Sequence, residues 1–367
     1  MKICENSVIS ADMDMIFHSN NKWEELNNKS ILVTGPYGML ASYMVLFLCY
    51  LVKEKGYNIK VITVGRNKTK FEKKFGEMGI FEGNYLRFVE SDLSGPLNID
   101  EPIDYIIHAA SLASPQYYGT CPVDVIKPNV IGNYNMLQLA VEKEVSGYLL
   151  FSTGDIYGKA ISSISAVSEC DYGVMDTLDI HNCYGESKRM AEALCKAFYV
   201  QYDVPVKIAR IWHTYAPTMD LENDPRVFAS FVRDVLTGHD IQMKSDGSGK
   251  RSFCYITDAV AGFFKILLEG NPGEAYNVCN ESQYISVLNL AEKIVALRPG
   301  KGLKVVRTER SSKEAYVENS LLKGVEIPPT SKKLQRLGWN PTVDVRAGFD
   351  RVISYKEGRN HDNAGNE

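Results

Sequence analysis

The residues most able to do chemistry are a tyrosine and a lysine four positions apart, Tyr184 and Lys188, in the segment YGESK. On a helix, positions i and i+4 share one face, so the phenol and the ammonium would lie side by side. A nearby cation favours the phenolate and lowers the pKa of a tyrosine from about 10 towards neutral pH. The spacing therefore predicts that Tyr184 is a general base for a hydroxyl group.

A second polar segment precedes this pair. Residues 151–158 (FSTGDIYG) begin as an apolar strand and end in a hydroxyl and a carboxyl group, those of Thr153 and Asp155. Ligands of open parallel α/β sheets bind beyond the carboxyl ends of the strands. The sequence therefore predicts that Thr153 and Asp155 lie where a bound ligand can meet them.

The first glycine-rich turn, residues 34–41 (TGPYGMLA), is typical of a dinucleotide-binding site, although an ordinary tight turn is the alternative. Gly35 permits the turn, and Gly38 lets the backbone approach a pyrophosphate. Tyr37 and Met39, in the same turn, join them as candidate cofactor-binding residues. The helix that follows would add N–H donors and the positive end of its dipole.

The second apolar run ends in Arg66 rather than in a carboxylate that could hold an adenosine ribose. An arginine here can accept a 2′-phosphate, which favours NADP over NAD unless Arg66 is a solvated turn residue. After the third run, Asp92 and the following Leu93 are placed to meet the adenine. Capping of a turn is the alternative role for Asp92.

Six short apolar runs alternate with helix-length segments, which indicates an α/β fold with a parallel sheet covered on both faces. The runs are residues 30–34, 59–64, 85–89, 103–109, 148–152 and 206–211. The pattern predicts a Rossmann-type doubly wound sheet over residues 30–211, preceded by an N-terminal extension of residues 1–29. Residues 212–355 would form a smaller mixed α/β substrate lobe, with some segments returning to the sheet, and residues 356–367 a polar, frayed tail.

The composition excludes several classes of protein. The 367 residues carry a net charge of -4 and no long basic block, so nucleic acid is not an expected partner. The longest apolar run, residues 39–52, is shorter than the roughly 20 residues of a membrane span, and the first residues do not form a secretory signal. The eight cysteines lack CxxC spacing, which predicts a cytoplasmic protein without a metal site.

Five motifs in one order give the chain a resemblance to a known family. Besides the three segments above, they include HAASxASP at residues 108–115 and GSGKRSFCYITD at residues 247–258. Over residues 30–350 the chain resembles the extended short-chain dehydrogenases/reductases of the NAD-dependent epimerase/dehydratase family, which act on nucleotide sugars. Within that family, the likeness is strongest to UDP-glucuronate decarboxylases and dTDP-glucose 4,6-dehydratases.

The resemblance implies a role for each candidate residue. Thr153 would bind the C4 oxygen of the sugar, Tyr184 would take its proton, and Lys188 would hold the nicotinamide ribose. Asp155 would be the acid or base at C5. Further cofactor contacts are implied for Ala109, Ala110 and Ser111. Contacts with the nucleotide sugar are implied for Ser114, Tyr118, His213, Arg226, Lys244 and Arg251.

The implied reaction begins with oxidation of the C4 hydroxyl by bound NAD or NADP to a 4-keto sugar. Elimination across C5 and C6, or loss of a C6 carboxylate, would follow. A C4 epimerase and a catalytically silent dinucleotide sensor are the alternatives. The resemblance also implies a homodimer that pairs through residues 124–144 and 184–202.

The chain departs from the family pattern at several positions. Gly154 stands where the dehydratases have an aspartate and the decarboxylases a serine, and Asp155 replaces a glutamate. His213 replaces an asparagine, and Lys244 replaces a tyrosine that faces the nucleotide. These departures concern the second step and the nucleotide sugar, not the C4 oxidation.

Overall fold

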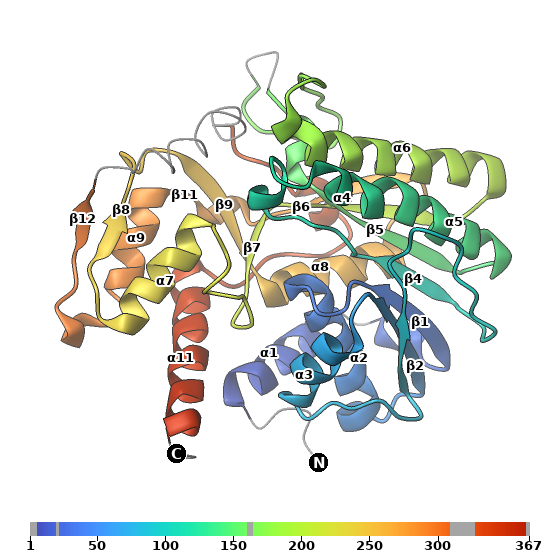
Figure 1. Cartoon of the computed structure of the whole chain (residues 1–367), viewed down its shortest axis with the longest axis horizontal. Helices are drawn as coiled ribbons and strands as arrows, with labels where there is room; N and C mark the ends of the chain where they lie inside the picture. The colour runs from blue at the N-terminus through green and yellow to red at the C-terminus, as the bar shows by residue number, and fades with distance from the viewer. Residues whose placement is uncertain (1–5, 20–21, 160–163, 309–326, 365–367) are drawn as a thin grey trace.

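The centre of the molecule is a seven-stranded parallel sheet, shown in Figure 1; the computed structural model describes residues 6–19, 22–159, 164–308 and 327–364. The strand order is β10-β6-β5-β4-β1-β2-β3. The strands are β1 (Lys29–Thr34), β2 (Ile59–Gly65), β3 (Leu86–Glu90), β4 (Tyr105–His108), β5 (Gly147–Thr153), β6 (Val206–Ile211) and β10 (Glu274–Val278). Because the order runs outward in both directions from β1, the sheet is doubly wound, and the predicted Rossmann architecture is confirmed.

Helices cover both faces of this sheet and enclose two apolar cores. One face carries α2 (Met39–Lys55), α3 (Lys68–Gly76) and α8 (Ile256–Glu269), and the other carries α4 (Pro122–Lys127), α5 (Asn133–Glu142) and α6 (Cys183–Tyr202). Successive strand residues point to opposite faces, so Ile31 and Val33 join the first core while Leu32 joins the second. Burial of both faces is the reason that the central strands β1, β4 and β5 are mainly apolar.

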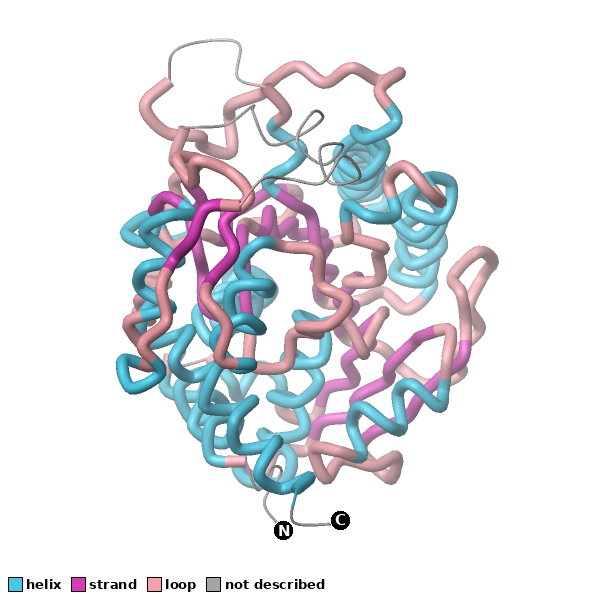
Figure 2. Tube along the Cα trace, turned by 60° about the vertical axis from the view of Figure 1, so that its left-hand side comes forward, coloured by secondary structure: helices cyan, strands magenta, loops and turns pink. Residues whose placement is uncertain are grey.

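The chain beyond β6 builds a smaller lobe, on the left in Figure 1 and turned towards the viewer in Figure 2. Its elements are β7 (His213–Tyr215), α7 (Val227–Thr237), β8 (Ile241–Met243), β9 (Lys250–Tyr255), β11 (Tyr284–Ser286), α9 (Val287–Val295) and β12 (Val305–Arg307). β9 pairs with β7 in parallel and with β11 antiparallel. α8 and β10 return to the main sheet, and α10 (Lys332–Gln335) packs on β10, so the lobe is joined to the sheet at several points.

Short helical turns connect these elements. They are η1 (Trp23–Leu26), η2 (Pro115–Tyr117), η3 (Pro128–Gly132), η4 (Gly154–Tyr157), η5 (Ile180–Asn182), η6 (Glu281–Gln283) and η7 (Pro299–Lys301). Within the described part of the chain, no helix is both long enough and apolar enough to span a bilayer.

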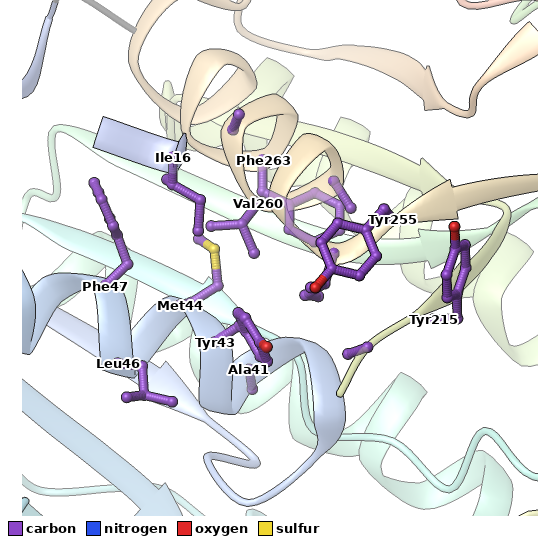
Figure 3. Close-up of a cluster of buried hydrophobic side chains, with 14 of the residues drawn as sticks. Ile16, Ala41, Tyr43, Met44, Leu46, Phe47, Tyr215, Tyr255, Val260 and Phe263 are labelled. Carbon is purple, nitrogen blue, oxygen red and sulfur yellow. The ribbon is translucent and has the colours of Figure 1, made fainter. Parts of the chain in front are cut away.

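The described part of the N-terminal extension is integrated into the core. Asn6 caps α1 (Ser7–His18), which packs against α2, α8 and α11 (Val345–Ala364). One face of α1 is buried, and Ile16 lies in the apolar cluster of Figure 3 beside side chains of α2. The indole of Trp23 packs on the rings of Phe47 and Phe264. The segment is therefore a structural part of the molecule rather than an appendage.

A buried carboxylate joins α1 to three other elements. Asp12 has no exposed surface and accepts hydrogen bonds from the hydroxyls of Tyr43 on α2 and Tyr255 on β9, each at 2.9 Å. Arg351 of α11 donates to the same carboxylate from Nε at 2.9 Å and from a terminal nitrogen at 2.7 Å. Figure 3 shows Tyr43 and Tyr255 on two sides of one cluster. Residues far apart in the sequence therefore meet at Asp12.

The C-terminal segment differs from the expectation. The sequence predicts a frayed tail from residue 356, whereas α11 continues as a helix to Ala364. Arg298 donates to Glu357 at 2.8 Å, and the Lys356 ammonium donates to the carbonyl of Met219 at 3.0 Å. A polar composition suits the solvated side of a helix, so it did not mark a helix end here. Residues 365–367 lie outside the described residues.

Candidate active site

The glycine-rich turn after β1 closes tightly against the segment that follows β4. Gly35 has φ +65°, and its N–H donates to the carbonyl of Val64 at 2.8 Å. A Cβ at this position would lie 2.8 Å from the Cα of Ala110, closer than carbon atoms approach. Gly38 then caps α2, whose N-terminus points its N–H groups at the turn. The turn thus forms a cradle in which only glycine fits.

Thr34 and His108 hold the two sides of this cradle together. The Thr34 hydroxyl accepts hydrogen bonds from the N–H groups of Ala109 at 3.1 Å and Ala110 at 3.0 Å. Its own proton therefore goes to Nδ1 of His108 at 3.0 Å, and Nε2–H of His108 donates to the carbonyl of Pro128. Burial lowers the pKa of His108 to about 3, so the ring is neutral and structural.

The adenosine end of the predicted cofactor site is formed by Tyr37 and Arg66. The Tyr37 hydroxyl accepts a hydrogen bond from the N–H of Arg66 at 2.9 Å. A Cβ on Gly65 would lie 2.9 Å from the Tyr37 ring, so the phenol lies directly on the end of β2. The Arg66 side chain is exposed, where it can meet either a ribose or a 2′-phosphate.

Asp92 makes the hydrogen bonds of a turn cap. One of its carboxylate oxygens accepts from the N–H of Ser94 at 2.9 Å and from the Ser94 hydroxyl at 2.7 Å. These hydrogen bonds lower the pKa of the Asp92 carboxyl. The next residue, Leu93, adopts φ +62°, and its carbonyl accepts from Asn135 at 2.9 Å. The Asp92 side chain is exposed.

Thr153, Tyr184 and Asp155 come together at the end of β5. The hydroxyl of Thr153 is hydrogen-bonded with both the Tyr184 phenol and the Asp155 carboxyl, and it accepts from the N–H of Asp155 at 3.2 Å. The Tyr184 ring is stacked on Tyr118, with centroids 5.2 Å apart. Two separate sequence segments therefore place three reactive groups around one point.

The pKa of Tyr184 differs from the expectation based on spacing. Burial raises it well above its ordinary value, the charge of Asp155 raises it further, and the hydrogen bond with Thr153 lowers it. Lys188 is close, with its ammonium 5.9 Å from the Tyr184 ring centroid, but it donates to the carbonyl of Phe151 at 2.6 Å. Burial also lowers the pKa of Lys188 to about 7, which weakens the cation that the spacing implied.

Asp155 is suited to hold a proton. Its side chain is solvent-accessible, yet the protein atoms crowded around it raise the pKa of the carboxyl group. The hydrogen bond with Thr153 and the charge of Arg251 act in the opposite direction. An acid with a raised pKa next to a hydroxyl and a phenol can donate a proton to a carbanion formed at this place.

Trp212 lies beside this group, and the sequence did not single it out. It directly follows β6, whose last residue, Ile211, pairs with Thr153. A Cβ on Gly154 would lie 2.9 Å from the Trp212 ring, so the indole fills the space of a side chain at residue 154. Only the pairing of β5 with β6 brings these residues together, and no local motif signals it.

The lobe contributes His213 from β7 and Arg251 from β9, two paired strands. Burial lowers the pKa of His213 to about 3, and the charges of Arg251 and Arg226 lower it as well. The Nδ1 atom of His213 is buried and has no hydrogen-bond partner among the described residues. Arg226 is held by a salt bridge with Asp224. The neutral imidazole and the charges of the two arginines that act on it are compatible with an anionic ligand.

The remaining predicted substrate residues divide into two groups. The Tyr118 hydroxyl donates to the carbonyl of Ala113 at 3.2 Å, and the Ser114 hydroxyl is buried without a hydrogen-bond partner in the described chain. Tyr118 belongs to the buried cluster that contains Tyr184. Lys244 is exposed after β8, in the other small sheet of the lobe, where its charge acts on Asp234.

Comparison with known proteins decides the family. Residues 31–279 match the family described as the NAD dependent epimerase/dehydratase family. The chain belongs to this family. It is 32% identical to UDP-glucuronic acid decarboxylase 6 of Arabidopsis thaliana, over 88% of this chain and 87% of that one. It is 31% identical to UDP-glucuronic acid decarboxylase 1 of Xenopus tropicalis, over 90% of this chain and 73% of that one.

Solved structures of other enzymes share the fold. UDP-glucuronic acid 4-epimerase from Bacillus cereus, in complex with UDP-glucuronic acid and NAD, superposes with a TM-score of 0.71 at 19% identity, over 90% of this chain and 99% of that one. dTDP-glucose 4,6-dehydratase from Bacillus anthracis, in complex with NAD, superposes with a TM-score of 0.68 at 19% identity, over 91% and 98%. α1 lies before residue 31, where the family match begins.

Members of this epimerase/dehydratase family depend on NAD, and the residues around the first turn fit such a cofactor. The cradle at Gly35 has no room for a side chain, and the α2 N-terminus can meet a diphosphate. The Ser111 hydroxyl is buried and lacks a hydrogen-bond partner among the described residues. Lys188 and Tyr37 would flank the nicotinamide and adenosine ends.

Proposed function

We propose that this protein is a decarboxylase that acts on a nucleoside-diphosphate hexuronate. Gly154 and Trp212 carry the proposal. Loss of water across C5 and C6 needs both a base at C5 and an acid for the departing hydroxyl. At the end of β5, the described residues supply one carboxyl group, Asp155, because the indole of Trp212 occupies the place of a second. Decarboxylation needs one acid only, to protonate C5 afterwards.

The residues of the chain divide the work as follows. Once it has lost its own proton, the Tyr184 phenolate takes the proton of the C4 hydroxyl while Thr153 holds the C4 oxygen. Tyr37, Gly38 and Lys188 would hold NAD, which would supply reversible hydride transfer at C4. The 4-ketone draws the electron pair of the C5–C6 bond towards its oxygen as carbon dioxide leaves, and Asp155 then protonates C5. Tyr184 returns its proton to the C4 oxygen, which leaves a nucleoside-diphosphate pentose.

We assign the nucleotide part of the substrate to the lobe of residues 212–355. Two arginine charges, those of Arg226 and Arg251, act on His213, whose Nδ1 atom has no hydrogen-bond partner in the described part of the chain. Arginine binds diphosphates through paired N–H groups, and the two guanidiniums offset the charge of the ligand in a protein whose net charge is -4.

A panel of UDP-, dTDP-, CDP- and GDP-linked hexuronates and hexoses, each with NAD and with NADP, tests the reaction. Mass spectrometry should show a hexuronate losing the mass of carbon dioxide without an added reductant, because the hydride is returned. Loss of the mass of water would indicate a dehydratase instead. The NADP samples show whether Arg66 accepts a 2′-phosphate, as the sequence favours, in a family that depends on NAD.

A C4 epimerase is the second candidate, since Thr153, Tyr184 and Lys188 alone could oxidise and reduce C4. Its product has the mass of the substrate and differs only in its NMR couplings. Asp155→Asn separates the two candidates, because an epimerase should keep most of its activity while a decarboxylase should lose it. An isobaric product from the wild type that persists in Asp155→Asn would replace our proposal.

We propose that two copies pair through α4, α5 and α6, which lie side by side in Figure 1. Exposed apolar side chains gather on these helices and on η3: Val123, Ile126, Ile131, Tyr134, Met190, Val200 and Tyr202. Sedimentation should give twice the chain mass, and Val200→Glu should shift it towards the monomer. Phe81→Glu, an equally exposed apolar position after α3, is the control and should stay dimeric. A monomeric wild type would contradict the proposal.

A cytoplasmic location is also proposed. The cysteines in the described residues are free thiols: Cys49, Cys121, Cys170, Cys183, Cys195, Cys254 and Cys279. Free thiols persist in a reducing compartment, which supports this location.

A further inference from the structure

A buried glutamate lies one helical turn beyond the candidate catalytic lysine. Glu192 follows Lys188 by four residues on α6, and its side chain is 12% exposed. The Ser152 hydroxyl on β5 donates to this carboxylate at 2.5 Å. Arg210 on β6 donates to it from Nε at 3.1 Å and from a terminal nitrogen at 2.8 Å. Two strands of the main sheet therefore bind one side chain of α6.

The same stretch of β5 binds Lys188. The Lys188 ammonium donates to the carbonyl of Phe151, and the next residue, Ser152, donates to Glu192. Since Tyr184, Lys188 and Glu192 are spaced by four residues, they lie on one face of the helix. The two contacts thus fix the height and rotation of this face of α6 above β5, and with it the place of Tyr184.

Glu192 is also the counter-charge of Lys188. The titratable groups that act with Lys188 are His108 on β4 and Tyr184, Glu192 and Cys195 on α6. His108 is neutral because its pKa is low, and the Tyr184 phenol and the Cys195 thiol are neutral because burial raises their pKa values. Burial lowers the pKa of Lys188, and the charge of Glu192 opposes this. Arg210 shares the carboxylate, so the two cations and one anion form a single buried group.

This group reaches the sugar side of the site. Arg210 donates to the Tyr157 hydroxyl at 3.0 Å, and that hydroxyl donates to Asn277 at 2.7 Å. The Trp212 indole N–H donates to the same Asn277 oxygen at 3.3 Å. The chain of contacts therefore runs from the lysine beneath the cofactor site to the indole that fills the place beside Gly154.

We propose that Glu192 is a positioning residue for the oxidation at C4, which holds the Lys188 ammonium charged and fixed on the face of α6 that carries Tyr184. The proposal rests on the proposed function, in which Tyr184 and Lys188 act on the sugar hydroxyl. It assigns to Glu192 a role through Lys188, without contact with the sugar or the cofactor.

Glu192→Gln tests the role of the charge, because it keeps the shape and an acceptor oxygen for Ser152. Without the carboxylate, Lys188 loses its proton at a lower pH. The alkaline limb of the pH–rate profile should therefore move down by about one pH unit, with a roughly tenfold loss of rate on that limb. Glu186→Gln is the matched control, since Glu186 lies on the same helix and pairs with Arg189 at 3.3 Å. Its profile should coincide with that of the wild type.

Ser152→Ala tests the position of Glu192 separately from its charge. It removes a contact of Glu192 and leaves the carboxylate, so the rate should fall while the alkaline limb stays in place. If the alkaline limb of the pH–rate profile of Glu192→Gln coincides with that of the wild type, the proposal is overturned.

NAD titration across the same pH range reports the protonation of Lys188 in the absence of any sugar. The pH above which NAD affinity falls should move down in Glu192→Gln by the same amount as the rate profile. If no nucleotide sugar reacts but this shift appears, the proposed reaction fails and the role of Glu192 stands. If the affinity profiles coincide, the role of Glu192 is refuted whatever the substrate. Comparison of melting temperatures identifies a variant that has merely unfolded.

Discussion

Replacing Tyr184 by phenylalanine is expected to lower turnover of the nucleotide sugar by roughly 10²–10⁴-fold, the usual contribution of a placed proton-transfer group. The phenolate form of Tyr184 is the group that takes the C4 proton, and Thr153, its hydrogen-bond partner, cannot replace it as a base. The ring itself stays, so its stacking on Tyr118 at 5.2 Å is kept and the fold should not change. The loss should appear in kcat, with NAD binding unaffected.

Tyr202→Phe is the matched control for this experiment. Tyr202 is the last residue of the same helix and is exposed, so removal of its hydroxyl should leave turnover unchanged. Rates are measured by the mass-spectrometric assay and NAD affinity by fluorescence titration. If Tyr184→Phe turns over as fast as the wild type, the proposed proton transfer is wrong. If neither protein changes any nucleotide sugar while both bind NAD, the silent dinucleotide sensor is the better description.

The parts of the site that follow from local spacing could be predicted from the sequence. The turn at Gly35 needs positive φ and close backbone approach, and both requirements are visible as a glycine between a strand and a helix. The parallel sheet was predicted because its central strands are buried on both faces and are therefore mainly apolar. Ligand-facing residues such as Thr153 could then be placed at the carboxyl ends of the strands.

The features that the sequence did not show depend on distance and burial. Spacing puts Lys188 near Tyr184, but the tyrosine pKa depends on how many protein atoms surround the phenol and on Asp155, which comes from another segment. Trp212 meets Gly154 only because β5 and β6 pair. Glu192 could have been noticed, since it lies four residues after Lys188 on the same helix. Its partner Arg210 lies on β6, so the spacing along α6 could not show their contact.

Residues 1–29 were predicted as a polar extension with a few apolar positions that could pack a helix, and α1 packs through such positions, among them Met13 and Ile16. A single apolar face is enough to bury α1, and its polar residues lie mostly on the other side. Asp12 is the exception, since it is polar and wholly buried. Its hydrogen-bond partners on β9 and α11 come from the far end of the chain, where no local pattern could indicate them.

Asp12→Ala is expected to lower the free energy of unfolding by about 3–5 kcal/mol, the usual cost of removing one partner of a buried ion pair. The substitution leaves the guanidinium of Arg351 and the hydroxyls of Tyr43 and Tyr255 without their shared acceptor. Urea denaturation followed by circular dichroism measures the loss. Asp14→Ala, on the same helix with a half-exposed carboxylate, is the control and should cost much less.

The direction of the Asp12 pKa makes a finer prediction. Burial raises the pKa of this carboxyl above its ordinary 3.8, and Arg351 only partly opposes the shift, because the hydration lost by the wholly buried partner is the larger effect. A raised folded-state pKa contributes stability below the unfolded value and loses it as the pH rises through the folded one. Asp12→Asn removes this titration and keeps an acceptor for the two tyrosines. It should therefore cost less than Asp12→Ala at neutral pH and show a flatter dependence of stability on pH.

The double variant Asp12→Ala with Arg351→Met shows what the ion pair itself contributes. Without the carboxylate, methionine removes the unpaired guanidinium, so the double variant should be more stable than Asp12→Ala alone. If the two losses simply add, Asp12 and Arg351 do not act as a pair, and the hydroxyl contacts alone explain the cost. If the double variant instead recovers most of the free energy of unfolding lost in Asp12→Ala, apolar packing around Asp12 and Arg351 is what holds α1 to α11. The ion pair would then add specificity rather than stability.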